Sequence, residues 1–129
     1  MKIIKSIFML LLFVILPSLY TDMYAQDPPI VAPNIYKRVA LDNERTRVMD
    51  VEIAAGEVVP WHTHPDHVLY VLFGGKIEIT DKDKPAVSMD LNAGDVLFIP
   101  AVTHTAKNIG TTTIKLIVTE IKKGNKKMK

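Results

Sequence analysis

All four histidines of this 129-residue chain lie in two short segments, the group His62, His64 and His67 and the single residue His104. Neutral imidazole is the commonest metal-binding side chain near physiological pH. Side chains two apart in an extended strand point to the same face, so His62 and His64 project together. A turn after His64 lets His67 face the same point, and a second turn lets His104 supply a nitrogen from across a sheet. The pattern predicts a metal site built from all four imidazoles.

Three or four imidazole ligands suit iron, manganese, zinc, nickel or copper, and they do not suit calcium or magnesium. We therefore expect one divalent transition metal as cofactor, whose identity the ligand types leave open. Leu69 and Val71 share the parity of His67 along the next strand, so we expect them to line an apolar pocket around the ion. Asn108, four residues after His104, either orients a ligand at this pocket or caps a turn.

Short β-rich runs separated by turn residues recur along most of the chain, and no segment sustains helical periodicity for three turns. With no helices to make parallel crossovers, this spacing predicts an all-β antiparallel sandwich or barrel. The runs that we interpret as strands are residues 36–41, 46–53, 58–62, 68–73, 76–80, 86–91, 96–99, 103–108 and 113–121.

The first 25 residues have the three-part pattern of a secretory signal peptide. Lys2 and Lys5 form a positive start, residues 7–16 are an unbroken apolar run, and a cut is expected between Ala25 and Gln26. A helix as long as that run spans only about half of the hydrocarbon core of a membrane. We therefore expect an exported protein, periplasmic or secreted, with no stable membrane insertion after cleavage.

The remaining chain is expected to form one domain. Residues 26–35 predict an extended Pro-rich arm, residues 36–121 a barrel, and residues 122–129 a frayed, Lys-rich tail. Over the full chain 16 basic residues nearly balance 14 acidic ones, and removal of Lys2, Lys5 and Asp22 leaves 14 against 13, which disfavours nucleic acid as a partner. Without cysteine the chain must rely on packing, a metal or association for stability. The arm and the exposed edges of a small barrel favour a homodimer.

Two sets of spaced residues stand out, Gly56, His62, His64 and Gly74, and then Gly94, Asp95, Pro100, His104 and Asn108. They resemble the two motifs of the cupin superfamily. The resemblance implies a small double-stranded β-helix, or jelly-roll barrel, with one metal held by two close histidines, a carboxylate and a later histidine. Carried over to this chain, it implies His62, His64 and His104 as ligands. The run from His62 to Val68 looks most like small single-domain cupins associated with β-alanine breakdown.

The glutamate that completes the first cupin motif is absent, and His67 stands in its place, seven residues before Gly74. An all-imidazole site lacks the negative charge of a carboxylate ligand. A divalent ion would then keep its full charge locally, which makes a bound water more acidic and an anionic substrate more welcome. His67 has a second possible role, orienting a ligand or carrying a proton.

Two functions fit these observations. The first is a metalloenzyme acting on a small organic substrate, a dioxygenase-like enzyme with iron or manganese, or an isomerase or hydrolase with zinc or nickel. It requires an open coordination position beside the protein nitrogens. The second is a non-catalytic module in which the metal captures a small ligand or stiffens the barrel.

A third interpretation comes from the string His62-x-His64-x-Asp66-His67, which also resembles the signature of metallo-β-lactamase-type hydrolases. In that fold a helix follows the motif. Here residues 68–73 follow it with a strand pattern, and the chain is about half the usual size, so Asp66 is better explained as a turn former.

Overall fold

A computed structural model describes residues 26–124 of the chain, which form nine strands and one short helix. Every strand expected from the sequence is present, and the bounds differ from the expected ones by two residues at most. The elements are α2 (Pro28–Val31), β1 (Tyr36–Asp42), β2 (Thr46–Ile53), β3 (Val58–His64), β4 (His67–Phe73), β5 (Gly75–Asp81), β6 (Val87–Leu91), β7 (Val96–Ile99), β8 (Val102–Asn108) and β9 (Ile114–Ile121).

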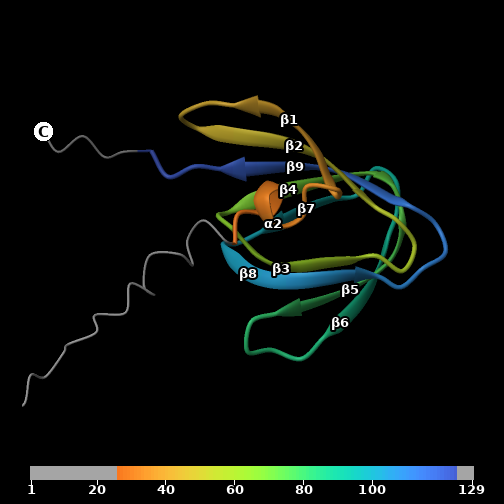
Figure 1. The fold of residues 1–129 in the computed structure, drawn as a ribbon. Coiled ribbons are helices and arrows are strands. Elements are labelled where there is room, and N and C mark those ends of the chain that lie inside the picture. Colours follow the sequence, from red (N-terminus) through yellow and green to blue (C-terminus); the bar gives the residue numbers. More distant parts are fainter. Residues whose placement is uncertain (1–25, 125–129) are drawn as a thin grey trace, which may run out of the picture.

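The strands form two antiparallel sheets that face each other (Figure 1). The five-stranded sheet has the order β1-β2-β9-β4-β7, and the four-stranded sheet has the order β3-β8-β5-β6. Strands that are distant in the sequence therefore lie side by side, as β2 and β9 do, or β3 and β8. This arrangement is the double-stranded β-helix, or jelly roll, that the sequence predicted.

The core lies between the sheets and is formed by strands in which inward-pointing apolar side chains alternate with outward-pointing ones. Along β2 and β9 every second side chain is apolar and points inward, so Met49 lies opposite Val118 and Val51 opposite Leu116. Burying one such side chain contributes about 1.5–3 kcal/mol. The same inward face continues to one end of the sheet, where it carries Arg47 and Glu120 in place of apolar residues.

Residues 26–35 differ from the extended arm that the sequence predicted. Pro28–Val31 form one helical turn, and Ala32 and Ile35 are buried in the core. The physical reason is that proline at the first helical position has a φ suited to the helix, while the apolar residues after it gain by burial. The backbone oxygen of Gln26 accepts a hydrogen bond from the Thr63 N–H of β3, at 2.8 Å, which fixes the start of the segment.

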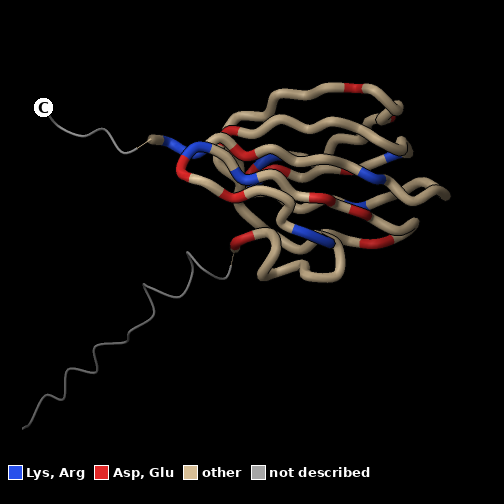
Figure 2. Tube along the Cα trace, turned by 90° about the horizontal axis from the view of Figure 1, so that it is seen from above, with Lys and Arg blue, Asp and Glu red and all other residues tan. Residues whose placement is uncertain are grey.

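Some sequence-based interpretations fall outside the described residues. The signal peptide lies in residues 1–25, and only residues 122–124 of the Lys-rich tail are described. There Lys122 forms an ion pair with Asp42 and its N–H donates to the Arg45 carbonyl at 2.8 Å. Within residues 26–124, no helix has the length and apolarity needed to cross a membrane. Figure 2 shows acidic and basic residues interspersed over the described strands.

Gly74, at the end of the first cupin-like motif, owes its identity to a close backbone approach. A Cβ atom at this position would lie 2.0 Å from the carbonyl oxygen of Leu91. No side chain fits there, so the chain can pass from β4 to β5 against the end of β6 only with glycine. Gly94 of the second motif has a positive φ of 91°, which other residues adopt with strain.

Candidate metal centre

The four histidines meet between the two sheets. His62 and His64 come from β3, and His104 comes from the adjacent strand β8, where it lies directly opposite His62. His67 is the first residue of β4, in the other sheet. All four side chains are buried, with His104 the most exposed at 7%. Because β3 and β4 belong to different sheets, the turn between them places His67 in the sheet opposite the other three histidines.

Three of the histidines have the spacing of a single metal site. Candidate ligand atoms of His62, His64 and His104 all lie within 4.8 Å of one another. The Nε2 atoms of His62 and His104 are 3.0 Å apart. Two nitrogens at 2.0–2.1 Å from one tetrahedral zinc ion would be about 3.3 Å apart. The described residues could therefore hold one metal ion at this point.

His67 lies beside this group but is not part of it. Its ring centroid is 4.4 Å from that of His64 and 6.4 Å from that of His104. A role for His67 as fourth ligand stays a prediction, as does its alternative role as a proton carrier.

Backbone carbonyls fix the orientation of two of the rings. The Nδ1 of His62 lies 2.7 Å from the Pro60 carbonyl oxygen, and the Nδ1 of His67 lies 2.8 Å from the Pro65 carbonyl oxygen. A carbonyl only accepts, so each Nδ1 carries the proton and each Nε2 keeps its lone pair. Such a contact sets the tautomer of a metal-binding histidine. A lone pair at 3.0 Å from another ring nitrogen requires a proton or a cation between the two atoms, and a metal ion fits this requirement.

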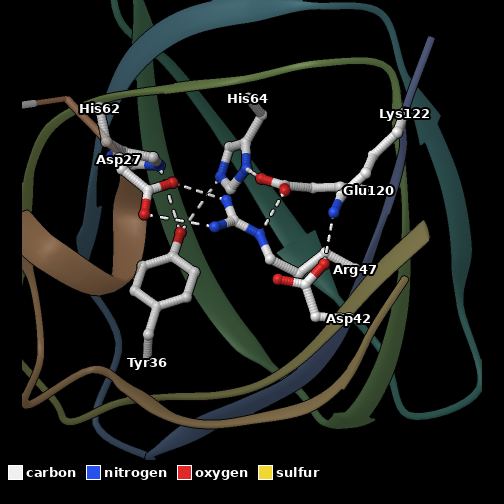
Figure 3. A network of polar contacts seen from close by, with 8 residues as sticks. All are labelled: Asp27, Tyr36, Asp42, Arg47, His62, His64, Glu120 and Lys122. Carbon is white, nitrogen blue, oxygen red and sulfur yellow. Dashed lines mark hydrogen bonds and ion pairs between the residues drawn. The ribbon is translucent and has the colours of Figure 1, made fainter. Parts of the chain in front are cut away.

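A buried carboxylate orients the third ring. The Nδ1–H of His64 donates to Oε1 of Glu120 at 2.6 Å, while Oε2 of Glu120 accepts from Nε of Arg47 at 2.7 Å. The two terminal nitrogens of the Arg47 guanidinium donate to the Asp27 carboxylate at 3.2 and 2.6 Å. Figure 3 shows this chain of contacts from Asp27 to His64. We call Asp27, Arg47 and Glu120 the charge relay.

None of the three residues of the charge relay was predicted, although the sequence carries a signal for Glu120 and Arg47. Glu120 has the parity of the inward residues Leu116 and Val118 along β9, and Arg47 has the parity of Met49 along β2. A charged residue that continues an apolar face predicts a buried ion pair, and the structure places Arg47 directly opposite Glu120. Asp27 gave no such signal, because it reaches Arg47 only through the fold.

Arg47 and Glu120 are charged at neutral pH. Burial by itself raises the pKa of Glu120, but hydrogen bonds from His64 and Arg47 outweigh it and hold that pKa below its ordinary value. Burial by itself lowers the pKa of Arg47, but its hydrogen bonds to Asp27 and Glu120 raise it above its ordinary value. Glu120 is therefore an anion that accepts from both neighbours.

The imidazoles of His62, His67 and His104 are neutral at physiological pH. Burial lowers the pKa of His62 to about 4 and the pKa of His104 to about 3, and in both cases the neighbouring histidines lower it further. Burial and then His64 also lower the pKa of His67. Protons therefore do not compete for the lone pairs that His62 and His104 would offer to a metal.

Tyr36 completes the surroundings of the centre, and nothing in the sequence pointed to it. Its hydroxyl lies 3.1 Å from Nε2 of His64 and 3.4 Å from Nε2 of His62. Burial, and then the charge of Glu120, raise the pKa of Tyr36 above its ordinary value. The side chain is thus a neutral phenol, a hydrogen-bond donor aimed at the centre (Figure 3).

Comparison with known proteins identifies the family. Residues 49–120, which contain all four histidines and Glu120, match the family described as Cupin domain. This chain belongs to the cupin family.

Solved cupin structures share the fold. The chain is similar to a cupin domain from Bordetella pertussis Tohama I, with 27% identity and a TM-score of 0.62 over 67% of this chain and 91% of that one. It is also similar to a cupin superfamily protein from Desulfitobacterium hafniense DCB-2, with 24% identity, a TM-score of 0.53, and coverage of 67% and 75%. No curated protein matches the chain.

The cupin fold excludes the metallo-β-lactamase interpretation of the histidine string. The residues after it form β4 of an all-β barrel, and no helix follows in the described part of the chain. Asp66 lies in the turn before β4, where its Oδ1 accepts a hydrogen bond from the Ala101 N–H at 2.8 Å. Asp66 therefore ties this turn to the one before β8, which carries His104.

A cavity of about 380 Å³ reaches the histidine cluster at His104. Its volume falls within the range of small-molecule sites, and most of its walls are apolar. The lining residues are Ile79, Asp81, Lys84, Pro85, Val87, Met89, Ile99 and His104.

The three residues expected to line the pocket occupy different places. Leu69 borders a small cavity of about 50 Å³ together with His62, His67 and His104. Val71 is fully buried in the core.

The structure does not bring Asn108 to the histidines. It lies four residues along β8 from His104, which in a strand is about 13 Å. Its amide nitrogen donates to the carbonyls of Ile53 and Thr112, and its oxygen accepts from the Gly110 N–H. Asn108 therefore fixes the turn between β8 and β9, the second of the two roles that its position suggested.

Proposed function

We propose that this cupin binds one divalent transition metal through His62, His64 and His104 and acts as a metalloenzyme on a small organic substrate. The observation that carries the proposal is the convergence of three buried histidines beside a cavity of about 380 Å³. A bound ion would supply Lewis acidity, or oxygen chemistry if it is redox-active. Iron or manganese supports a dioxygenase-like reaction, and zinc or nickel an isomerase or hydrolase.

The side chains around the centre support turnover. The apolar walls of the cavity would exclude water from a bound substrate, which strengthens hydrogen bonds made inside it. Tyr36 has a neutral hydroxyl that can donate to a substrate oxygen near His64. The neutral imidazole of His67, whose ring centroid is 4.4 Å from that of His64, can accept a proton there. The small carboxylates that we propose to test include β-alanine and related compounds, because the sequence resembles cupins associated with β-alanine breakdown.

A non-catalytic module is the second candidate, and one observation favours it. The four histidines are almost completely buried, and His67 comes from the sheet opposite the other three, so an ion that His67 also bound would join the two halves of the barrel. A metal that only stiffens the fold, or that captures a ligand without turnover, would need no more than this.

Turnover distinguishes the two candidates. We expect protein loaded with iron, manganese, zinc or nickel to convert at least one compound from a panel of small carboxylates and phenols, measured by oxygen uptake and by mass spectrometry of products. Protein with Tyr36→Phe, which keeps the ring and loses the hydroxyl, is expected to lose at least about 10-fold in turnover with unchanged metal content. A fully loaded protein that converts none of the panel favours the module.

We also propose that the protein is a homodimer, joined through the outer face of β4 and β7. Tyr70 and Leu72 of β4 and Val96 and Phe98 of β7 are exposed there, Phe98 at 61%. Neither strand contains an acidic residue, lysine or arginine, so two copies meet without like charges. β7 ends its sheet, and a second β7 placed along it would give a continuous, symmetric sheet.

Light scattering at micromolar concentration checks the dimer. We expect the mass of two chains for the wild type and of one chain for Phe98→Glu, because the substitution places two carboxylates in the apolar interface. Trp61→Glu, which changes an exposed aromatic residue on β3, should leave the dimer intact. A monomeric wild type would refute the interface.

We further propose that the protein is exported to the periplasm or secreted, on the basis of the basic start and apolar run of residues 1–25. The intact mass of protein recovered from the exported fraction should correspond to a chain that begins at Gln26. A chain that retains Met1 and stays inside the cell would refute export.

A further inference from the structure

Glu120 is distinctive among the charged residues of the described chain. Among the Asp, Glu, Lys and Arg side chains of residues 26–124 it is the one that is buried, at 2% exposure. Burying a lone carboxylate costs several kcal/mol, so a buried one needs partners that compensate. Glu120 has two, the imidazole of His64 on one oxygen and the guanidinium of Arg47 on the other.

We propose that Glu120 is a positioning residue of the metal centre. Through its hydrogen bond to His64 it would supply the negative charge that a carboxylate ligand would otherwise bring to the ion. The inference rests on the metal site proposed above. It also corrects the expectation that an all-imidazole site leaves the full charge of the ion uncompensated. A carboxylate is present, one hydrogen bond behind the ligand.

The charges of the relay add to a net negative charge beside His64. Arg47 alone would neutralise Glu120, but both terminal nitrogens of its guanidinium are held by Asp27, at 2.6 and 3.2 Å. Two carboxylates and one guanidinium leave one negative charge in the relay. An ion on Nε2 of His64 withdraws electrons from the ring and makes its Nδ1–H a stronger donor. The anion at 2.6 Å therefore stabilises the metal-bound ring more than the free one.

The relay also fixes where His64 points. Glu120 lies opposite Arg47 in the register of β2 and β9, and opposite His67 in the register of β4 and β9. Its carboxylate is held on both oxygens, so it offers His64 one acceptor in one place. A ring flip would break this contact and turn Nε2 away from the centre.

The test compares metal affinities in the full chain. We expect Glu120→Gln, which keeps the size and one acceptor but removes the charge, to weaken zinc and cobalt(II) binding by about 10–100-fold in chelator competition. The visible spectrum of the cobalt(II) protein should change as well, since it reports the ligand field. Glu52→Gln is the matched control, because Glu52 pairs with Lys115 across the same two strands on the outer face, at 3.2 Å. It should bind both metals as the wild type does.

A second variant covers the case in which Glu120→Gln does not fold. Asp27→Asn leaves both contacts of Glu120 in place and lets Arg47 neutralise it, so we expect a smaller but measurable loss of affinity. Unchanged affinity in a folded Glu120→Gln protein, or in Asp27→Asn where the first variant does not fold, overturns the inference. A purely structural role would lower the thermal midpoint of the metal-free protein and leave affinity unchanged. A wild type that binds neither metal refutes the metal site itself, which is a separate outcome.

Discussion

Alanine at position 62, 64 or 104 is expected to reduce bound metal by at least about 100-fold. Each change removes one of three ligand atoms that lie within 4.8 Å of one another, and two imidazoles are a poor site for a divalent ion in competition with water. Elemental analysis of purified variants, after dialysis against a weak chelator, measures the effect. His67→Ala is expected to retain more metal than these three, since His67 lies outside the group.

Thr63→Ala is the matched control for these variants. Thr63 lies on β3 between two of the histidines, and its hydroxyl bonds on the opposite side, to Gln26 and Thr103. The substitution should leave the metal content at the wild-type value. Wild-type metal content in all three histidine variants would contradict the site.

The metal-free protein is expected to lose stability as the pH falls from about 6.5 to 4. The pKa of His62 is lowered to about 4 in the folded state, and in the unfolded chain it has its ordinary value near 6.5. Below pH 6.5 the unfolded chain therefore binds more protons, and the free energy of unfolding decreases. For His62 alone the loss reaches about 3 kcal/mol near pH 4. His104 acts in the same direction over a window that extends to about pH 3.

Glu120 extends this dependence to lower pH. The pKa of Glu120 in the folded state is below the ordinary value. Its contribution to the free energy of unfolding is therefore complete above about pH 4.5 and is lost as the pH falls through that folded-state pKa. Urea unfolding at pH 7.5, 6.0, 5.0 and 4.0 measures the curve. His104→Gln should reduce the change in the free energy of unfolding between pH 6.5 and 4, because it removes one buried imidazole whose pKa is lowered in the folded state. A free energy of unfolding that stays constant over this range would mean that the rings are not buried in the neutral form.

The sequence predicted the strands well for a definite reason. In β2 and β9 apolar residues alternate with polar ones and turn residues stand at both ends, so local pattern and tertiary burial agree. The helical turn at Pro28–Val31 was not predicted, because consecutive prolines also suit an extended chain. The burial of Ala32 and Ile35 favours the helical turn over an extended chain, and that burial depends on contacts with the rest of the fold.

The site divides in the same way. His62 and His64 could be found from spacing, because side chains two residues apart in a strand share a face. His104 could be found because it is the one remaining histidine of the chain and follows a turn. Glu120 could have been found from its inward parity along β9. Tyr36 could not be found, since it meets the histidines from 26 and 28 residues away and nothing local marks it.

The N-terminal segment has a consequence for how this cupin is cut into domains. The stretch that matches the family, residues 49–120, holds all the imidazoles and their carboxylate. Asp27, Tyr36 and Arg47 precede it, yet they supply the relay's outer charges and the phenol at the centre. A fragment trimmed to the family boundaries would keep every ligand and lose part of the wall around them. The N-terminal boundary of the family match therefore separates the histidines from three residues that surround them in the folded protein.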